Sequence, residues 1–278
     1  MVISSENFAL DNSVEASINF VVDTGVHVVN IPSTPDGEKS SHIGEYEEKT
    51  VSINDARAAK HRLTLEQAGF ELVDFETEVT NFYDTDQITG TYNAEIQALI
   101  KRETGAADVV VFDHTLRAGD DAIRAEKQVR EPVQRAHNDY THRSGPIRVQ
   151  DWFGKKQAEP YLERRFAIIN IWRSIFGAVE SMPLAICDAR TVTKDDLVPA
   201  ERRAKERIGE TYRLSYNANQ RWFYFPFMQM DEAMLIKSYE SEEEGRARFT
   251  PHTAFVDPTT PPGATHRQSI ETRVFAFF

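Results

Sequence analysis

The stretch Ala136-His137-Asn138-Asp139-Tyr140 places an imidazole and a carboxylate two residues apart. Residues two apart on an extended strand point to the same face, so His137 and Asp139 can bind one divalent metal ion from adjacent positions. A third protein ligand is needed to fix the ion, and we expect it to be His252, in Phe249-Thr250-Pro251-His252-Thr253-Ala254-Phe255. Three other histidines are alternatives for this position: His114, His142 and His266. His252 follows His137 by 115 positions, so the fold must bring two distant strands together.

Composition limits the class of protein and the kind of partner. The chain has 278 residues, 40% of them hydrophobic, which is enough for a sizeable core, and its formal net charge is −12. This acidic balance argues against a nucleic-acid groove or an anionic membrane surface and favours a small-molecule substrate. The single cysteine, Cys187, excludes an internal disulfide and a cysteine-rich zinc site. With no signal-like N-terminus and no apolar run of membrane-spanning length, we expect a cytoplasmic protein of open oligomeric state.

Short strand-like runs are concentrated in the second half of the chain. They are expected at residues 108–114, 147–152, 166–173, 213–216, 222–225, 234–239 and 267–278, with earlier strands within 14–31 and at 71–75. Helices are expected at 56–67, 92–102, 120–130, 159–165 and 194–207, and a loop at 32–49. This pattern predicts a mainly β protein with flanking helices, a double-stranded β-helix of the jelly-roll, cupin-like kind. We expect one domain over residues 1–278, with an N-terminal strand and helix layer at 1–107 and the barrel core at 108–278.

A second group of polar residues lies on the last expected strand. Strand alternation places Arg267, Ser269, Glu271 and Arg273 on one face. A guanidinium holds a carboxylate through two parallel hydrogen bonds, and a nearby hydroxyl adds a further donor. Arg267 follows His252 by 15 positions, across a proline-rich turn, so antiparallel strands would bring the carboxylate receptor and the metal into one pocket. Arg273, on the same face, is the alternative receptor.

Longer phrases of the sequence carry a family resemblance. They are Leu63-Thr64-Leu65-Glu66-Gln67-Ala68-Gly69-Phe70, Val110-Val111-Phe112-Asp113-His114, Ala136-His137-Asn138-Asp139-Tyr140, Ile169-Asn170-Ile171-Trp172-Arg173, Trp222-Phe223-Tyr224-Phe225-Pro226 and Pro251-His252-Thr253-Ala254-Phe255. In this order, and with Arg267-x-Ser269, they resemble the Fe(II)/2-oxoglutarate-dependent oxygenases of the hydroxylase/desaturase family, which includes cephem-methoxylase-like and gibberellin-desaturase-like proteins. The resemblance spans nearly the whole chain.

The resemblance implies a complete set of roles. His137, Asp139 and His252 would bind Fe(II), while Arg267 and Ser269 would hold the distal carboxylate of 2-oxoglutarate, leaving one position for O2. Oxidative decarboxylation to succinate and CO2 would yield a ferryl oxidant that hydroxylates or desaturates a small natural product. Further residues that could line the substrate pocket are Asn170, Trp172, Arg173 and Arg273. Two alternatives remain at this point: a cupin-like metal enzyme that uses no 2-oxoglutarate, and a non-catalytic small-molecule-binding barrel.

Overall fold

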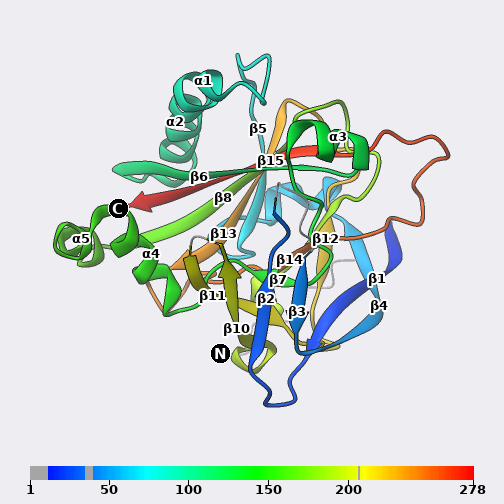
Figure 1. Cartoon of the computed structure of the whole chain (residues 1–278), viewed down its shortest axis with the longest axis horizontal. Coiled ribbons are helices and arrows are strands. Elements are labelled where there is room, and N and C mark those ends of the chain that lie inside the picture. Colours follow the sequence, from blue (N-terminus) through cyan, green and yellow to red (C-terminus); the bar gives the residue numbers. More distant parts are fainter. Residues whose placement is uncertain (1–11, 35–39, 206) are drawn as a thin grey trace.

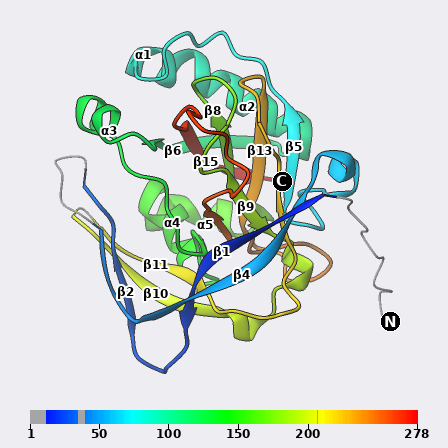
Figure 2. The same cartoon turned by 90° about the vertical axis from the view of Figure 1, so that its right-hand side faces the viewer.

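The computed structural model describes residues 12–34, 40–205 and 207–278, which form two facing sheets (Figures 1 and 2). The larger sheet has the strand order β1-β4-β12-β9-β14-β7-β11-β10-β2-β3. Its strands are β1 (Ser13–Val22), β2 (Val28–Ile31), β3 (Ser41–Ile43), β4 (Glu45–Asp55), β7 (His137–Asn138), β9 (Leu184–Cys187), β10 (Leu197–Ala204), β11 (Arg207–Leu214), β12 (Trp222–Tyr224) and β14 (His252–Ala254). Most neighbours in this sheet are far apart in sequence, as a jelly roll requires.

The smaller sheet has the order β5-β13-β8-β15-β6, and all its pairings are antiparallel. Its strands are β5 (Phe70–Asp74), β6 (Asp108–Ala118), β8 (Phe166–Ser174), β13 (Glu232–Glu240) and β15 (Gln268–Phe277). Every residue of β8, β13 and β15 is buried, because one face of the sheet packs inside the barrel and the other is covered. Strand β8 is therefore mostly apolar, whereas β13 and β15 also carry buried polar and charged side chains such as Lys237 and Glu271.

Helix α2 (Asn93–Thr104) covers the outer face of the smaller sheet, close to β6 (Figure 1). Its buried residues Ile96, Leu99 and Ile100 join the same apolar cluster as Ile169 and Val274 of the sheet. Gly105 ends the helix in the left-handed conformation, with φ of 73°, which glycine adopts at little cost. A second apolar cluster, which includes Trp172, Ile186 and Phe223, fills the space between the two sheets.

The other helices are short and lie around the barrel. They are η1 (Arg57–Arg62), α1 (Thr85–Gln87), η2 (Ile88–Tyr92), α3 (Asp121–Lys127), α4 (Ser144–Phe153), α5 (Lys155–Leu162), η3 (Ala189–Thr191) and η4 (Lys194–Asp196). The expected double-stranded β-helix with flanking helices is thus confirmed. The N-terminal part contributes strands β1 to β4 to the larger sheet and β5 to the smaller one.

Four local predictions are wrong. The expected loop at 32–49 contains β3 and the first half of β4, and the helix expected at 56–67 is only the 3-10 turn η1. The strand expected at 147–152 is helix α4, and the charged helix expected at 194–207 is largely strand β10. Strand β10 is rich in residues that favour helices, but it pairs with β11 along its whole length and with β2 on its other edge. Sheet pairing outweighs the weak intrinsic propensity of such residues.

Candidate metal centre

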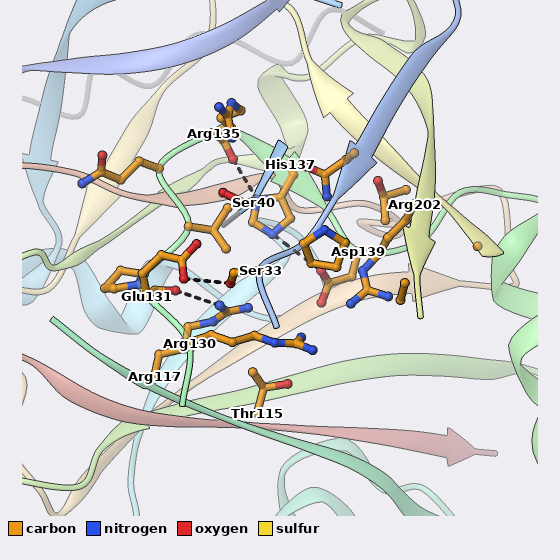
Figure 3. A pocket seen from close by; sticks show the side chains of 18 of the residues that line it. Ser33, Ser40, Thr115, Arg117, Arg130, Glu131, Arg135, His137, Asp139 and Arg202 are labelled. Atoms are coloured by element: carbon orange, nitrogen blue, oxygen red, sulfur yellow. Dashed lines mark hydrogen bonds and ion pairs between the residues drawn. The ribbon is translucent and has the colours of Figure 1, made fainter. Parts of the chain in front are cut away.

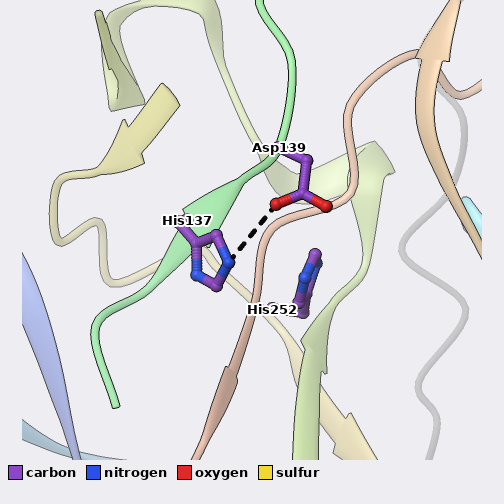
Figure 4. Close-up of side chains that lie close together, drawn as sticks. All are labelled: His137, Asp139 and His252. Atoms are coloured by element: carbon purple, nitrogen blue, oxygen red, sulfur yellow. Dashed lines mark ion pairs between the residues drawn. The ribbon is translucent and has the colours of Figure 1, made fainter. Parts of the chain in front are cut away.

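Three side chains from distant parts of the chain converge inside the barrel (Figure 4). His137 lies on β7, Asp139 follows that strand directly, and His252 on β14 pairs with His137 across the two strands. One ligand atom from each residue lies within 4.8 Å of the other two, a spacing that suits a bound metal ion. Within the described part of the chain, no other group of three or more histidine, cysteine or carboxylate side chains is this close.

Backbone carbonyls orient both imidazoles. Nδ1 of His137 donates to the carbonyl oxygen of Arg135 at 2.8 Å, and Nδ1 of His252 donates to that of Thr250 at 3.0 Å. Because a carbonyl only accepts, each Nδ1 carries the proton and each Nε2 keeps a free lone pair. Burial, together with the nearby His252, lowers the pKa of His137 well below its usual range, so this ring is neutral. A neutral imidazole with Nε2 exposed to the centre is the form that binds a metal.

Asp139 is oriented by two donors on one of its oxygens. Its Oδ2 accepts from Nδ2 of Asn170 and from Nε of Arg273, both at 2.8 Å. Oδ1 faces Nε2 of His137 at 3.6 Å and is left for a metal. Burial raises the pKa of Asp139, but the Arg273 guanidinium outweighs this and holds it well below its usual range. The ligand set is therefore two imidazoles and one carboxylate anion.

Asn138, the residue between His137 and Asp139, links the two ligand-bearing segments by hydrogen bonds. Its Oδ1 accepts from the backbone N–H of Thr250 at 3.0 Å, and its Nδ2 donates to the carbonyls of Tyr140 and Ser238. The carbonyl of Thr250 in turn orients His252. This role was not predicted from the sequence, although a polar residue that lies between two candidate ligands and points to the opposite face was a usable signal.

The two candidate carboxylate receptors, Arg267 directly before β15 and Arg273 on it, differ in their free hydrogen-bonding capacity. Each nitrogen of Arg273 donates to a carboxylate: Nε to Asp139, Nη1 to Asp113 and Nη2 to Glu271. Arg267 donates only from Nη1, to the carbonyl of Met182, and its buried Nε has no partner in the described structure. Burial, with a contribution from Arg117, lowers the pKa of Arg267 to about 9.

The remaining predicted residues divide between the two faces of the smaller sheet. Asn170 and Trp172 point into the barrel, where Asn170 bridges Asp139 and Glu271 and the Trp172 ring lies 5.2 Å from the Arg267 guanidinium. Ser269 is buried and pairs with Arg117 of β6. Arg173 points to the opposite face, where its guanidinium lies over the rings of Phe75 and Phe82 and donates to the carbonyl of Met230. It is therefore absent from the site that we describe.

The other histidines weighed as ligands lie elsewhere. His114 contacts Thr272 and Asn93 on the outer side of the sheet, and His142 contacts the hydroxyl of Tyr212. His266 is exposed, in the segment before β15.

A cavity of about 1080 Å³ opens next to the three converging side chains (Figure 3). His137 and Asp139 line it, whereas His252 is buried behind them. A substrate could therefore approach a bound metal from one side only. Arg117, Arg130 and Arg202 reach into this cavity, and none of them was identified from the sequence.

A jelly-roll barrel with two histidines and one carboxylate on one side of a metal, and open positions on the other, is typical of mononuclear non-heme iron oxygenases. Comparisons of the sequence and the structure with known proteins support this class of enzyme. The family described as "Oxidoreductase/YMDC permease-like domain" matches residues 18–277. In the part of the chain that the structure covers, no helix is both long and apolar enough to cross a membrane.

Similar proteins with known names identify the group of iron oxygenases more closely. "Hydroxylase/desaturase CTB9" of Cercospora beticola is 32% identical over 255 residues, which is 84% of this chain and 78% of that protein. "Fe(II)/2-oxoglutarate-dependent dioxygenase nvfI" of Aspergillus novofumigatus (strain IBT 16806) is 32% identical over 235 residues, 82% of each chain. The solved structure of the "iron and alpha-ketoglutarate-dependent endoperoxidase NvfI" superposes with a TM-score of 0.84 at 28% identity, covering 96% of this chain and 98% of that one.

The chain belongs to the Fe(II)/2-oxoglutarate-dependent oxygenases of the hydroxylase/desaturase family. It is therefore an enzyme whose chemistry uses Fe(II), 2-oxoglutarate and O2. The alternatives of a 2-oxoglutarate-independent cupin or a non-catalytic barrel are not supported.

Proposed function

We propose that His137, Asp139 and His252 bind the Fe(II) ion and that Arg267 and Ser269 hold the distal carboxylate of 2-oxoglutarate. The observation that carries the metal assignment is the orientation of the three side chains: both Nε2 atoms and Oδ1 of Asp139 face one point, while every other polar atom of the triad is hydrogen-bonded. This donor set of imidazole nitrogen and carboxylate oxygen fits Fe(II).

Free hydrogen-bonding capacity supports Arg267 over Arg273 as the carboxylate receptor. An unpartnered buried guanidinium N–H is costly unless a ligand accepts from it, and Arg267 has one. Arg273 instead orients Asp139, because all three of its guanidinium nitrogens already donate hydrogen bonds to protein carboxylates.

The proposed roles of the chain's own residues are to bind, orient and exclude water. Asn170 and Arg273 keep Asp139 ionised and turned toward the metal, and the carbonyls of Arg135 and Thr250 hold the two imidazoles. When bound, iron together with 2-oxoglutarate and O2 supplies the oxidative release of succinate and CO2 and the removal of hydrogen from an unactivated substrate C–H bond. The apolar packing around Trp172 keeps bulk water from the side of the site opposite the cavity.

We further propose that the substrate is a small natural product that is hydroxylated or desaturated. The names of the relatives support this, since several are called hydroxylase/desaturase and one is "Aspirochlorine biosynthesis protein N" of Aspergillus oryzae. The chain is proposed to act as one domain, because strands of the N-terminal part pair directly with barrel strands. Its single cysteine is buried and free, which supports a reducing, cytoplasmic location.

The test is anaerobic titration of the protein with Fe(II) and then 2-oxoglutarate, followed by the visible charge-transfer absorption of a 2-oxo acid chelated to iron. We expect the absorption in the wild type and its loss in His252→Ala, with His266→Ala as the matched control because His266 is an exposed histidine outside the site. Arg267→Gln should retain metal binding and require at least about tenfold more 2-oxoglutarate, since a charged hydrogen bond is lost. Unchanged 2-oxoglutarate affinity in Arg267→Gln would overturn the assignment of this residue.

A further inference from the structure

The cavity beside His137 and Asp139 concentrates positive charge in an acidic protein. Among the described residues that line it, nine are arginines and four are aspartates or glutamates, although the whole chain has a formal net charge of −12. Arginine is the residue that best matches carboxylate geometry, and a concave site of one sign raises the local concentration of ligands of the other sign. The local charge of the cavity is therefore opposite to that of the protein.

Several of these arginines are already bound by protein groups. Arg273 contacts Asp139, Asp113 and Glu271, and Arg117 donates to the carbonyl of Glu131 at 2.9 Å. These side chains need no further partner to explain their position.

Three other arginines have unused donors. The guanidinium groups of Arg130 and Arg202 make no hydrogen bond or ion pair with any residue that the structure describes. Arg213 is 3% exposed, and its buried Nε and Nη1 have no partner among the described residues. Arg130 and Arg202 are only partly buried, but an unpaired cation that is as buried as Arg213 is costly unless a ligand compensates it.

The three arginines come from different parts of the chain and line the same cavity as His137 and Asp139. Arg202 lies on the face of β10 that also carries the buried Val198 and Ala200, and Arg213 on β11 pairs directly with His137 of β7. Arg130 lies beside Arg117 of β6 in an isolated bridge. In Figure 3, Arg130 and Arg202 point toward the same part of the cavity as Asp139.

The electrostatics agree with an incomplete anion site. Burial, together with the nearby Arg273 and Arg130, lowers the pKa of Arg202 to about 10. The charged form of Arg202 is thus destabilised, and a bound anion would reverse this effect.

We propose that the primary substrate is a small organic acid whose carboxylate binds Arg130, Arg202 and Arg213 beside the metal. This rests on the proposed function, because the cavity meets the metal at His137 and Asp139. The apolar part of the acid packs against Tyr46, Phe112 and Tyr140, which line the same cavity. The site is distinct from the proposed 2-oxoglutarate receptor, since neither Arg267 nor Ser269 is among the described lining residues.

The experiment compares two fluorescent probes with the same ring system, the anionic anilinonaphthalene sulfonate and the neutral phenylnaphthylamine. Binding is measured anaerobically on the enzyme saturated with Fe(II) and 2-oxoglutarate, with displacement by benzoate and by benzyl alcohol. We expect the anionic probe to bind at least about tenfold more tightly, and benzoate but not benzyl alcohol to displace it. Arg202→Gln and Arg130→Gln should each weaken the anionic probe about tenfold and leave the neutral one unchanged.

The matched control is Arg203→Gln, because Arg203 follows Arg202 on β10 but is exposed and paired with Glu201. It should bind both probes as the wild type does. Equal binding of the two probes on the enzyme saturated with 2-oxoglutarate, or an equal effect of the Arg202 and Arg203 variants, would overturn the proposal. Failure of the proposed function is seen separately, as absence of the iron and 2-oxoglutarate absorption in the same samples.

Discussion

Replacing Arg273 by glutamine tests whether the partners of Asp139 set the affinity for the metal. In the wild type, Oδ2 of Asp139 accepts one charged and one neutral hydrogen bond, from Arg273 and Asn170, and the variant loses the charged one. Loss of such a partner weakens metal binding about 10- to 100-fold, or about 1.4 to 2.7 kcal/mol. The buried Glu271 loses its charge partner too, so the free energy of unfolding should fall by about 3 kcal/mol.

The assay is titration with Co(II), followed by visible absorption, at a urea concentration well below the unfolding midpoint of the variant. Arg267→Gln is the matched control, because Arg267 is also a buried arginine on the same face of the β15 segment but contacts none of the three ligands. We expect its Co(II) affinity to stay within about twofold of the wild type. If Arg273→Gln bound Co(II) as tightly as Arg267→Gln, the orienting role of Arg273 would be refuted.

Three further predictions concern stability. Although burial raises the pKa of Glu66, the cations around it lower this pKa from 4.5 to about 2, so its ionisation stabilises the fold above pH 4.5 and less as the pH falls toward 2. Because the side chain is 39% exposed, Glu66→Gln should cost only about 1 kcal/mol in urea unfolding at pH 7, and less at pH 3; an equal cost at both would contradict this. Gly69 has φ of +86°, and an added Cβ would overlap Thr250, so Gly69→Ala should cost about 2 to 4 kcal/mol and weaken Co(II) binding, whereas Gly90→Ala, with nothing within 4 Å, should do neither. Co(II) at 100 times its dissociation constant should stabilise the wild type by about 2.7 kcal/mol in thermal unfolding, and a similar gain in His252→Ala would count against His252 as a ligand.

The fold class was predictable because strand density and the order of polar motifs are properties of the sequence alone. The alternation of His137 and Asp139 and the apolar run of β8 were enough to anticipate a barrel that brings distant strands together. Local elements failed where pairing partners decide the structure. Residues 147–152 were expected to form a strand but belong to helix α4, and residues 194–207 were expected to form a helix but are largely strand β10. In both segments tertiary contacts outweigh the local sequence pattern.

The side chains around the site were less predictable than the candidate ligands themselves. That Arg273 contacts three carboxylates depends on Asp113 of β6 and Asp139 after β7 reaching the same point, which no local pattern encodes. Strand alternation did contain the information that Arg173 lies opposite Asn170 and Trp172, because it differs from them by an odd number of positions. The prediction that all three residues line one pocket overlooked this alternation.

The misassigned segment 194–207 also explains why the arginines of the cavity were not found. On an exposed helix, Arg202 and Arg203 would both be solvated, and the acidic net charge of the protein gives no reason to look for an anion site. On strand β10 the same two residues point to opposite faces, so one pairs with Glu201 at the surface and the other enters the cavity beside Asp139. Net charge describes the outer surface that a macromolecule meets, whereas a small substrate meets only the residues that line its cavity. The acidic composition and a substrate anion are therefore compatible, and the face of β10 on which an arginine lies decides whether it is solvated or can bind a carboxylate in the cavity.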